Sequence, residues 1–239
     1  VGHGIQSNRW LALGRSGRTV TAVRLDGGIV SSSTATTLLV ASESEARIAG
    51  RPGLPWPNGV QSPQELLAAS VNARGDIAFG YYDGSFLEGG IVAAGPPESL
   101  AVWRGGKALS APALFNDGRV AFVGQIDPKA GTPEKLFVGP IADPQPVLGI
   151  GDAAPGVSGE VLVSSNESVG LFVAIEPLGR FVIGGYTRRT DEFPAARLAV
   201  WEGYPGNLQL ALRDGQSVAG VQLRRLREVR VSAAGDLIV

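Results

Sequence analysis

The chain has 239 residues, of which 44% are hydrophobic and 34 are glycine, so it can bury a large core and is not disordered over most of its length. Its 21 Lys and Arg residues balance 22 Asp and Glu residues, and the net charge of −1 provides no overall basic field for nucleic acid or an anionic membrane. The chain has no cysteine and one histidine, His3, which excludes disulfide bonds, thiolate metal sites and cysteine nucleophiles. We therefore predict no cofactor and no metal site.

No stretch of the chain reaches the roughly 18–20 uncharged apolar residues that a membrane-spanning helix needs. The best apolar run, residues 29–41, is short and rich in Ser and Thr. We therefore predict that the chain does not span a membrane. It begins at Val1 and contains no Met, which is typical of a processed product or an excised segment.

Short runs of apolar and β-branched residues alternate with Gly, Pro, Asn and Asp along the whole chain. This alternation predicts many short β-strands joined by tight turns. The predicted strands are residues 19–25, 37–41, 76–80, 100–103, 119–123, 135–138, 159–163, 169–175, 180–183, 198–201 and 208–212. Residues 63–71 instead favour a helical turn or two. The pattern is typical of an all-β sandwich, barrel or propeller.

Three sequence patterns recur in the same order and decide among these folds. A turn glycine followed by a short apolar strand occurs at Gly17, Gly75, Gly118, Gly179 and Gly235. A Leu-x-Val strand follows each of the first four, at residues 38–40, 100–102, 136–138 and 198–200. Residues 151–157 also align without gaps on residues 215–221. A period of about 55 residues with about four short strands is typical of propeller blades.

We therefore predict an all-β, β-propeller-like fold, formed as a single domain by residues 1–239. It has about four blades of short antiparallel strands plus a closing or partial fifth. Two interpretations of the last strand remain open. It closes the ring against the first blade, or the chain is one piece of a larger ring.

One repeat carries a recognisable signature. Residues 72–79, Asn-Ala-Arg-Gly-Asp-Ile-Ala-Phe, match the NxxGxxAF motif, and residues 116–122 match it with one residue deleted. The chain thus resembles the bacterial exported tandem-repeat proteins named for that motif, and residues 151–156 resemble the turn that precedes the next repeat in that family. The resemblance implies a propeller-like bacterial protein that is periplasmic, on the cell surface or extracellular. It implies no catalytic residues.

Charged residues recur directly after the anchor glycines. Asp76 and Asp236 hold this position in two repeats, and Arg18, Arg119 and Arg180 hold it in the others. The alternation favours a network of salt bridges or a solvated rim. The alternative is a pair of carboxylates at the mouth of the central channel, placed to cleave glycans.

Aromatic and basic residues supply the candidate binding sites. Trp103 and Trp201 indicate packing between blades or, alternatively, a platform for a sugar ring. An irregular proline-rich loop, a predicted hairpin with aromatic flanks and an arginine-rich segment are the other candidates. The residues that we single out there are Trp56, Tyr81, Tyr82, Arg224, Arg225 and Arg227.

These features favour a non-catalytic, exported binding or scaffold module that engages a protein partner, as a subunit of a larger assembly. The alternative function is a carbohydrate-binding or glycan-cleaving propeller. No phosphate-binding motif is present, and no aromatic residues alternate with the arginines, so we predict no nucleic-acid partner.

Overall fold

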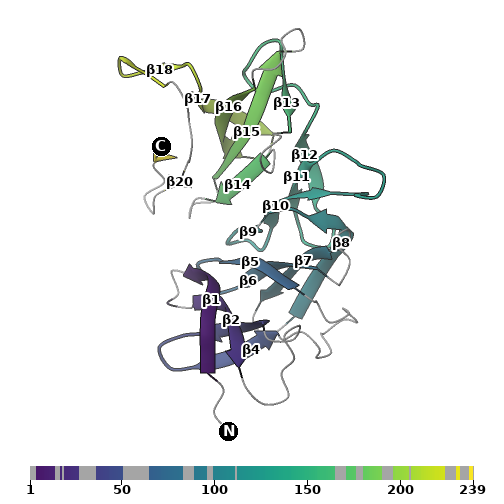
Figure 1. Ribbon diagram of the computed structural model, residues 1–239, viewed down its shortest axis with the longest axis vertical. Helices are drawn as coiled ribbons and strands as arrows, with labels where there is room; N and C mark the ends of the chain where they lie inside the picture. Colours follow the sequence, from purple (N-terminus) through teal and green to yellow (C-terminus); the bar gives the residue numbers. More distant parts are fainter. Residues whose placement is uncertain are drawn as a thin grey trace.

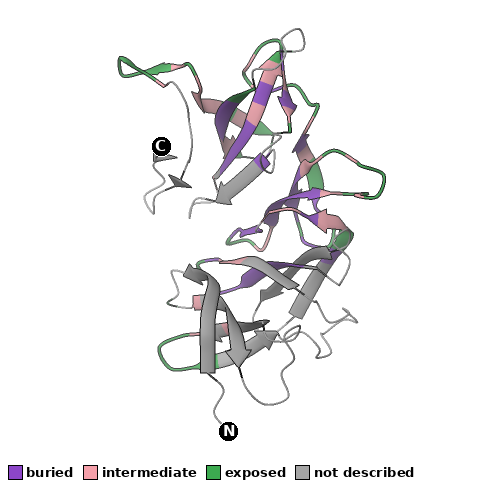
Figure 2. Ribbon diagram, in the orientation of Figure 1, coloured by how far each residue is buried: buried purple, intermediate pink, exposed green. Residues whose placement is uncertain are grey.

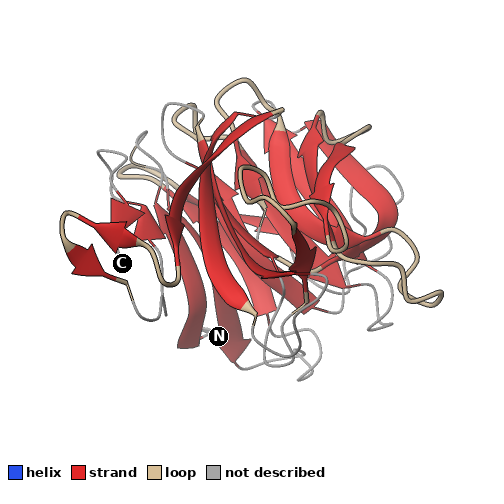
Figure 3. Cartoon of the chain, turned by 90° about the horizontal axis from the view of Figure 1, so that it is seen from above, coloured by secondary structure: helices blue, strands red, loops and turns tan. Residues whose placement is uncertain are grey.

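The computed structural model describes residues 4–13, 17, 19–26, 36–50, 65–82, 89–95, 99–110, 112–164, 171–175, 180–189, 196–204, 206–223, 230–231 and 237–238. Over these residues the chain forms β-strands and turns, with no helix (Figure 3). All the strand pairs are antiparallel. The prediction of an all-β chain is confirmed.

The strands form a four-stranded, an eight-stranded and a five-stranded sheet and two two-stranded sheets. We divide them into four successive blades and part of a fifth, with the eight-stranded sheet as the second and third blades. The first blade contains β1 (Gly4–Leu13), β2 (Thr19–Asp26), β3 (Thr36–Ala41) and β4 (Ala46–Gly50). The second contains β5 (Glu65–Val71), β6 (Ile77–Tyr82), β7 (Gly89–Gly95) and β8 (Ser99–Ala108). The third contains β9 (Ala113–Leu114), β10 (Val120–Gln125), β11 (Lys135–Gly139) and β12 (Gln145–Gly149).

In the fourth blade the first strand comes in two pieces. These are β13 (Glu160–Val163) and β14 (Leu171–Ile175), which pair with different halves of β15 (Phe181–Arg189). The blade continues with β16 (Arg197–Tyr204) and β17 (Asn207–Arg213). A hairpin of β18 (Ser217–Val218) and β19 (Val221–Gln222) follows, and β20 (Arg230–Val231) pairs with β21 (Leu237–Ile238).

The blades are arranged in an arc around one axis. The first strands of successive blades touch in chain order: β1 packs against β5, β5 against β9, β9 against β14, and β14 against β20. Figure 1 shows the arc, with β1 at one end and β20 at the other. In the described part of the chain β21 pairs with β20 and with no strand of the first blade, so the ring is not closed. The described residues therefore do not show the last strand closing the ring against the first blade.

The side chains of a strand point alternately to its two faces, and this explains how one blade is buried on both faces. Val120 and Phe122 of β10 belong to an apolar cluster shared with the second blade, whereas Ala121 and Val123 belong to a cluster shared with the fourth. Successive side chains of a strand point to opposite faces, so each blade separates two cores. All four of these residues are fully buried (Figure 2).

The predicted helical turn at residues 63–71 is wrong. Residues 65–71 form β5, which pairs with β6 through Ala69 and Phe79 and through Ser70 and Ala78. A short apolar run does not distinguish helix from buried strand by its periodicity, and here pairing with β6 decides the outcome. The other strands outside the predicted set are β1, β4, β7, β9, β12, β18, β19 and β20.

The Leu-x-Val strands are not all equivalent. In the first, third and fourth blades they are the third strand, next to the strand that follows the anchor glycine. In the second blade β7 lies between them, so residues 100–102 belong to the fourth strand, β8. The two copies of Leu-Ala-Val-Trp, at residues 100–103 and 198–201, therefore occupy different places in their blades.

Strand β8 passes directly from the second blade to the third. Its residues from Ser99 to Gly106 pair with β7, and its last two residues, Lys107 and Ala108, pair with β10. Gly106 lies at the crossing, where a Cβ atom would stand 1.9 Å from the carbonyl oxygen of Gln125. The close approach of the two backbones therefore requires a glycine there.

We expect Gly106→Ala to lower the free energy of unfolding by about 2 kcal/mol more than Gly131→Ala does. Both glycines have a positive φ, but a Cβ atom at Gly131 meets nothing within 4 Å. Urea unfolding followed by circular dichroism measures the difference. Equal losses for the two variants would contradict the close backbone approach at Gly106.

Candidate functional site

The hairpin turn between β5 and β6 contains the NxxG part of the signature. The N–H of Asn72 donates to the carbonyl of Asp76 over 3.1 Å, and the N–H of Gly75 donates to the carbonyl of Asn72 over 3.1 Å. Gly75 has a φ of +85°, in the left-handed region that glycine favours. The signature residues therefore build a tight turn, as the sequence predicted.

The turn between β9 and β10 has the same backbone hydrogen bonds one blade further on. The N–H of Phe115 donates to the carbonyl of Arg119 over 2.9 Å, and the N–H of Gly118 donates to the carbonyl of Phe115 over 3.1 Å. Phe115 therefore takes the place of Asn72. The sequence alignment gave that place to Asn116, and the structure corrects it by one residue.

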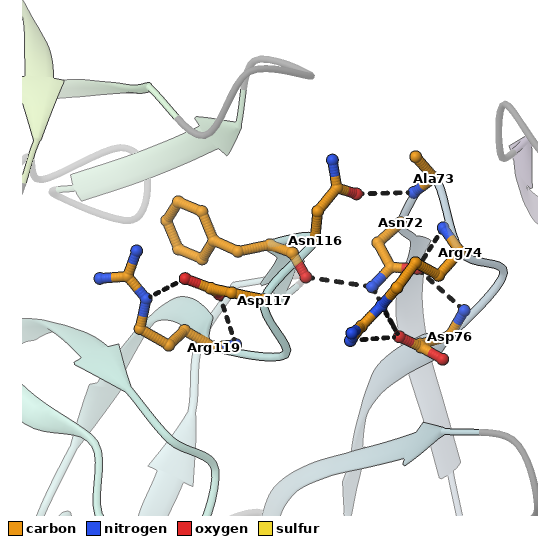
Figure 4. A network of polar contacts seen from close by, with 8 residues as sticks. Asn72, Ala73, Arg74, Asp76, Asn116, Asp117 and Arg119 are labelled. Atoms are coloured by element: carbon orange, nitrogen blue, oxygen red, sulfur yellow. Dashed lines mark hydrogen bonds and ion pairs between the residues drawn. The ribbon is translucent and has the colours of Figure 1, made fainter.

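The side chain of Asn72 joins the second blade to the third (Figure 4). Its amide nitrogen donates to the Asp76 carboxylate over 2.8 Å and to the carbonyl of Phe115 over 3.0 Å. Its amide oxygen accepts the N–H groups of Arg74, over 3.0 Å, and Asp76, over 2.9 Å. Asn72 and Asp76 are both buried. One buried amide thus connects the turns of two neighbouring blades.

Asn116 makes a second connection between the same two turns. Its side-chain oxygen accepts the N–H of Ala73 over 2.9 Å. Asn116 therefore also joins the second blade to the third, although it is exposed and does not take the place of Asn72.

Each of the two turns carries its own ion pair. The arginine precedes the aspartate in the first turn and follows it in the second. In the first, the Arg74 guanidinium binds the Asp76 carboxylate, with Nη2 2.7 Å from Oδ2. In the second, Arg119 Nε lies 2.7 Å from Asp117 Oδ2. The alternating Asp and Arg residues after the anchor glycines thus pair within their own turns here, while Arg180 in the fourth blade pairs with Glu202, 3.1 Å away. Asp236 lies outside the described residues.

The electrostatic environment lowers the pKa of Asp117. Partial burial alone would raise the pKa of this carboxyl, but hydrogen bonds from the backbone N–H and side chain of Arg119, with the charge of Arg119, hold it below its ordinary value. A carboxyl with a lowered pKa in the folded state stabilises the fold above its unfolded pKa of about 4. That stabilisation disappears as the pH falls through the lowered value.

We expect Asp117→Asn to lower the free energy of unfolding at pH 7 by less than about 1 kcal/mol, because the pair is solvent-exposed and screened. The difference from the wild type should shrink as the pH falls below about 4, since the wild-type carboxyl is then protonated as well. Urea unfolding at several pH values measures both effects. A difference that is the same at pH 7 and at low pH would show that the charge is not responsible.

Trp103 and Trp201 both pack between blades. Trp103 is 7% exposed, and its ring centroid lies 4.6 Å from that of Phe122 and 5.6 Å from that of Phe137. Trp201 is fully buried, and its Nε1 donates to the carbonyl of Pro155 over 2.7 Å. Neither side chain offers a surface to a sugar ring, so the packing interpretation is the one that the structure supports.

Of the other candidate binding residues, the structure describes only Tyr81 and Tyr82. Tyr81 lies on β6 and is 4% exposed, so the side chain of this candidate binding residue belongs to the interior. The physical reason is that β6 is covered on the side to which Tyr81 points, a fact that a hairpin motif does not reveal. Tyr82 ends the same strand. Trp56, Arg224, Arg225 and Arg227 lie outside the described residues.

An open pocket of about 870 Å³ lies beside the last strand of the fourth blade. It is lined by Ala196, Arg197, Leu210, Arg213, Asp214, Gly215 and Gln216. The buried carboxylate of Glu160 forms an ion pair with the Arg213 guanidinium, and the Asp214 carboxylate accepts the N–H of Leu198 over 3.0 Å. Two of the charged groups that face the pocket are therefore already bound by the protein. Sequence reasoning did not find this pocket, because its residues come from separate elements.

The hairpin of β18 and β19 projects from the fourth blade (Figure 1). Its paired residues Val218 and Val221 are 40% and 65% exposed. Two apolar side chains therefore face solvent side by side on one short hairpin. This hairpin is the second candidate site, and the sequence singled it out only as a repeat.

Two further properties concern only the described residues. Among them, no three His, Cys, Asp or Glu side chains gather closely enough to hold a metal ion. The same part of the chain contains no helix of the length and hydrophobicity that crossing a bilayer requires.

Comparison with known proteins supports the fold class. No protein-family model and no curated protein matches the chain. In three dimensions it is similar to the β-propeller domain of the Trilobed protease from Pyrococcus furiosus, a domain described as having an open velcro topology. The TM-score is 0.55 at 8% sequence identity, over 87% of this chain and 58% of that chain.

The fold is thus β-propeller-like, as predicted from the repeats. The likeness at 8% identity concerns the fold alone. The chain spans 58% of the length of the propeller chain that it matches.

Proposed function

We propose that this chain is a non-catalytic binding module of a bacterial protein exported from the cytoplasm, and that it engages a protein partner. The proposal rests on the projecting hairpin of β18 and β19, whose valines are exposed. Exposed apolar side chains grouped on one element are typical of protein interaction sites. The resemblance to the exported NxxGxxAF repeat proteins supports the location, and it remains a prediction.

The arrangement of the polar groups supports a role without catalysis. The Asp76 carboxylate is held by Asn72 and Arg74, and the Glu160 carboxylate is held by Arg213. A general acid or base must be within reach of a substrate proton, and these carboxylates are instead used to join strands and blades. Trp103 and Trp201, on which the interpretation as a platform for a sugar ring rested, are buried in the core.

A capture experiment tests the proposal. We expect the immobilised chain to retain a discrete protein from an extract of its source organism, and to bind no sugar on a glycan array. The matched variants are Val221→Glu, on the hairpin, and Ile126→Glu, at a position that is 53% exposed in the third blade. We expect the first to lose the partner and the second to keep it. Failure to retain any protein, or binding to a sugar, would overturn the proposed function.

A further inference from the structure

The pocket beside β17 gathers buried polar atoms that lack a partner. Among the described residues, four buried side-chain nitrogen or oxygen atoms form no hydrogen bond. Two of them, Arg213 Nε and Gln216 Oε1, belong to residues that line the pocket, and a third, Glu160 Oε2, belongs to the carboxylate that pairs with Arg213. Buried polar atoms in folded proteins are normally hydrogen-bonded. Their concentration here indicates that the pocket takes a polar ligand.

The pocket lies on the side of the fourth blade that is turned to the third blade. Ala199 pairs with Arg213 and belongs to the apolar cluster that these two blades share. Arg197 lies two residues before Ala199 on β16, so it lies on the same face of the sheet. Leu198 and Val200 belong instead to the cluster on the opposite face. Two arginines thus lie diagonally across neighbouring strands, at one end of the blade.

Only one of these two arginines has a carboxylate partner. Arg213 pairs with Glu160. Arg197 is exposed, and within the part of the chain that the structure describes its guanidinium forms no ion pair or hydrogen bond. The Asp214 carboxylate, which also lines the pocket, accepts the N–H of Leu198. Arg197 is therefore the cation that is available to an anionic ligand.

Two of the lining residues are particular to the fourth blade. The strand register and the turn hydrogen bonds show that Arg213 has the place of Gly149 in the third blade, and that Gln216 has the place of Asp152. At Gly149 a Cβ atom would stand 2.9 Å from Cγ of Lys135, so the chain's own lysine fills that corner. The corner of a blade therefore forms without Arg213 or Gln216, and a binding role accounts for their presence.

The polar atoms of the pocket specify the chemistry of the ligand. A carboxylate offers two acceptor oxygens, which match the donor fork of a guanidinium. The buried Gln216 Oε1 accepts a hydrogen bond, so the ligand must also carry a donor. The end of a peptide chain combines both groups on one residue, because its carboxylate and its N–H are attached to the same Cα atom. Leu210 and Ala196 add apolar surface for the last side chain.

We propose that this pocket binds the C-terminal carboxylate of a protein partner. Arg197 and Arg213 donate to the carboxylate, and Gln216 accepts the N–H of the partner's last residue. Capture of a terminal carboxylate is one of the recurring modes of peptide recognition. The inference rests on the proposed function and names the part of the partner that is recognised.

Three short peptides serve as probes, and each ends in leucine. Acetyl-alanyl-leucine has a free terminal carboxylate, acetyl-alanyl-leucinamide has no carboxylate, and acetyl-aspartyl-leucinamide has its carboxylate on a side chain. Each is titrated into the 239-residue chain, and the side-chain NMR signals of Arg197 and Gln216 are followed. We expect the peptide with the free terminal carboxylate to bind at least about tenfold more tightly than either amide, because charge-assisted hydrogen bonds to arginine are strong.

Arg197→Gln should weaken binding of the free-carboxylate peptide at least about tenfold, because it removes the available cation. Lys129→Gln is the matched control. It removes one positive charge from an exposed loop between β10 and β11 and should leave binding unchanged. Circular dichroism verifies that both variants are folded.

Four results would overturn the inference. They are equal binding of acetyl-alanyl-leucine and its amide, equally tight binding of the aspartyl peptide, no binding of any peptide, and an unchanged affinity in Arg197→Gln. Equally tight binding of the aspartyl peptide would assign the pocket to acidic side chains and not to a chain terminus.

The two proposals fail separately when the capture experiment is repeated with Arg197→Gln. A partner that is lost with Val221→Glu and kept with Arg197→Gln would support the proposed function and overturn this inference. Binding of the free-carboxylate peptide without capture of any protein would overturn the proposed function and leave the preference of the pocket in place.

Discussion

Replacing Trp201 with alanine is expected to lower the free energy of unfolding by about 3–5 kcal/mol. The side chain is fully buried in the cluster that joins the third blade to the fourth, and it is among the largest fully buried side chains of the described chain. Its removal would leave a cavity and would also leave the carbonyl of Pro155 without its indole donor. Because domains are stable by only about 5–15 kcal/mol, the variant should lose a large part of its stability.

Urea unfolding measures this effect, with Trp201→Phe as the matched control. Phenylalanine retains most of the apolar volume but has no N–H, so it should cost about 1–3 kcal/mol, mainly through the unpaired carbonyl. A loss below about 1 kcal/mol for the alanine variant would show that Trp201 does not join the two blades as described.

Asn72→Ala is expected to cost about 2–4 kcal/mol, the largest loss that we predict for a polar side chain. The substitution removes four hydrogen bonds, to Asp76, Phe115 and Arg74. It leaves the carbonyl of Phe115 and the buried carboxylate of Asp76 with fewer partners, and unpaired buried polar groups are costly. The loss should loosen the contact between the second and third blades.

Asn116→Ala is the matched control for this prediction. It removes a side chain that is exposed and accepts one N–H across the same interface, so it should cost less than about 1 kcal/mol. Urea unfolding of both variants measures the difference. If the two losses are equal, burial of the Asn72 network does not explain its contribution.

The strands that follow the anchor glycines could be predicted because the local signals are strong. A turn glycine followed by apolar residues indicates a hairpin turn and a buried strand. In the structure Gly75 and Gly118 have the positive φ that such a turn requires. The blade-like repeat then follows from their recurrence. Residues 65–71 were misread because a short run of leucine and alanine fits a helix or a strand, and only pairing with β6 resolves it.

The candidate sites could not be predicted as well, because exposure depends on the neighbours that the fold supplies. Tyr81 appears in a hairpin motif and is buried, whereas Val218 and Val221 appear in a repeat and are exposed. The equivalence of Asn116 and Asn72 was also wrong by one residue. The sequence aligned identical residue types, while the backbone hydrogen bonds place Phe115 opposite Asn72.

A crystal structure of the 239-residue chain tests the propeller-like arrangement most directly. We predict that the first strands of successive blades, β1, β5, β9 and β14, will touch in chain order around one axis, with the turns at residues 72–76 and 115–119 side by side. Two sheets stacked face to face, with no rotation that relates the repeats, would contradict this account.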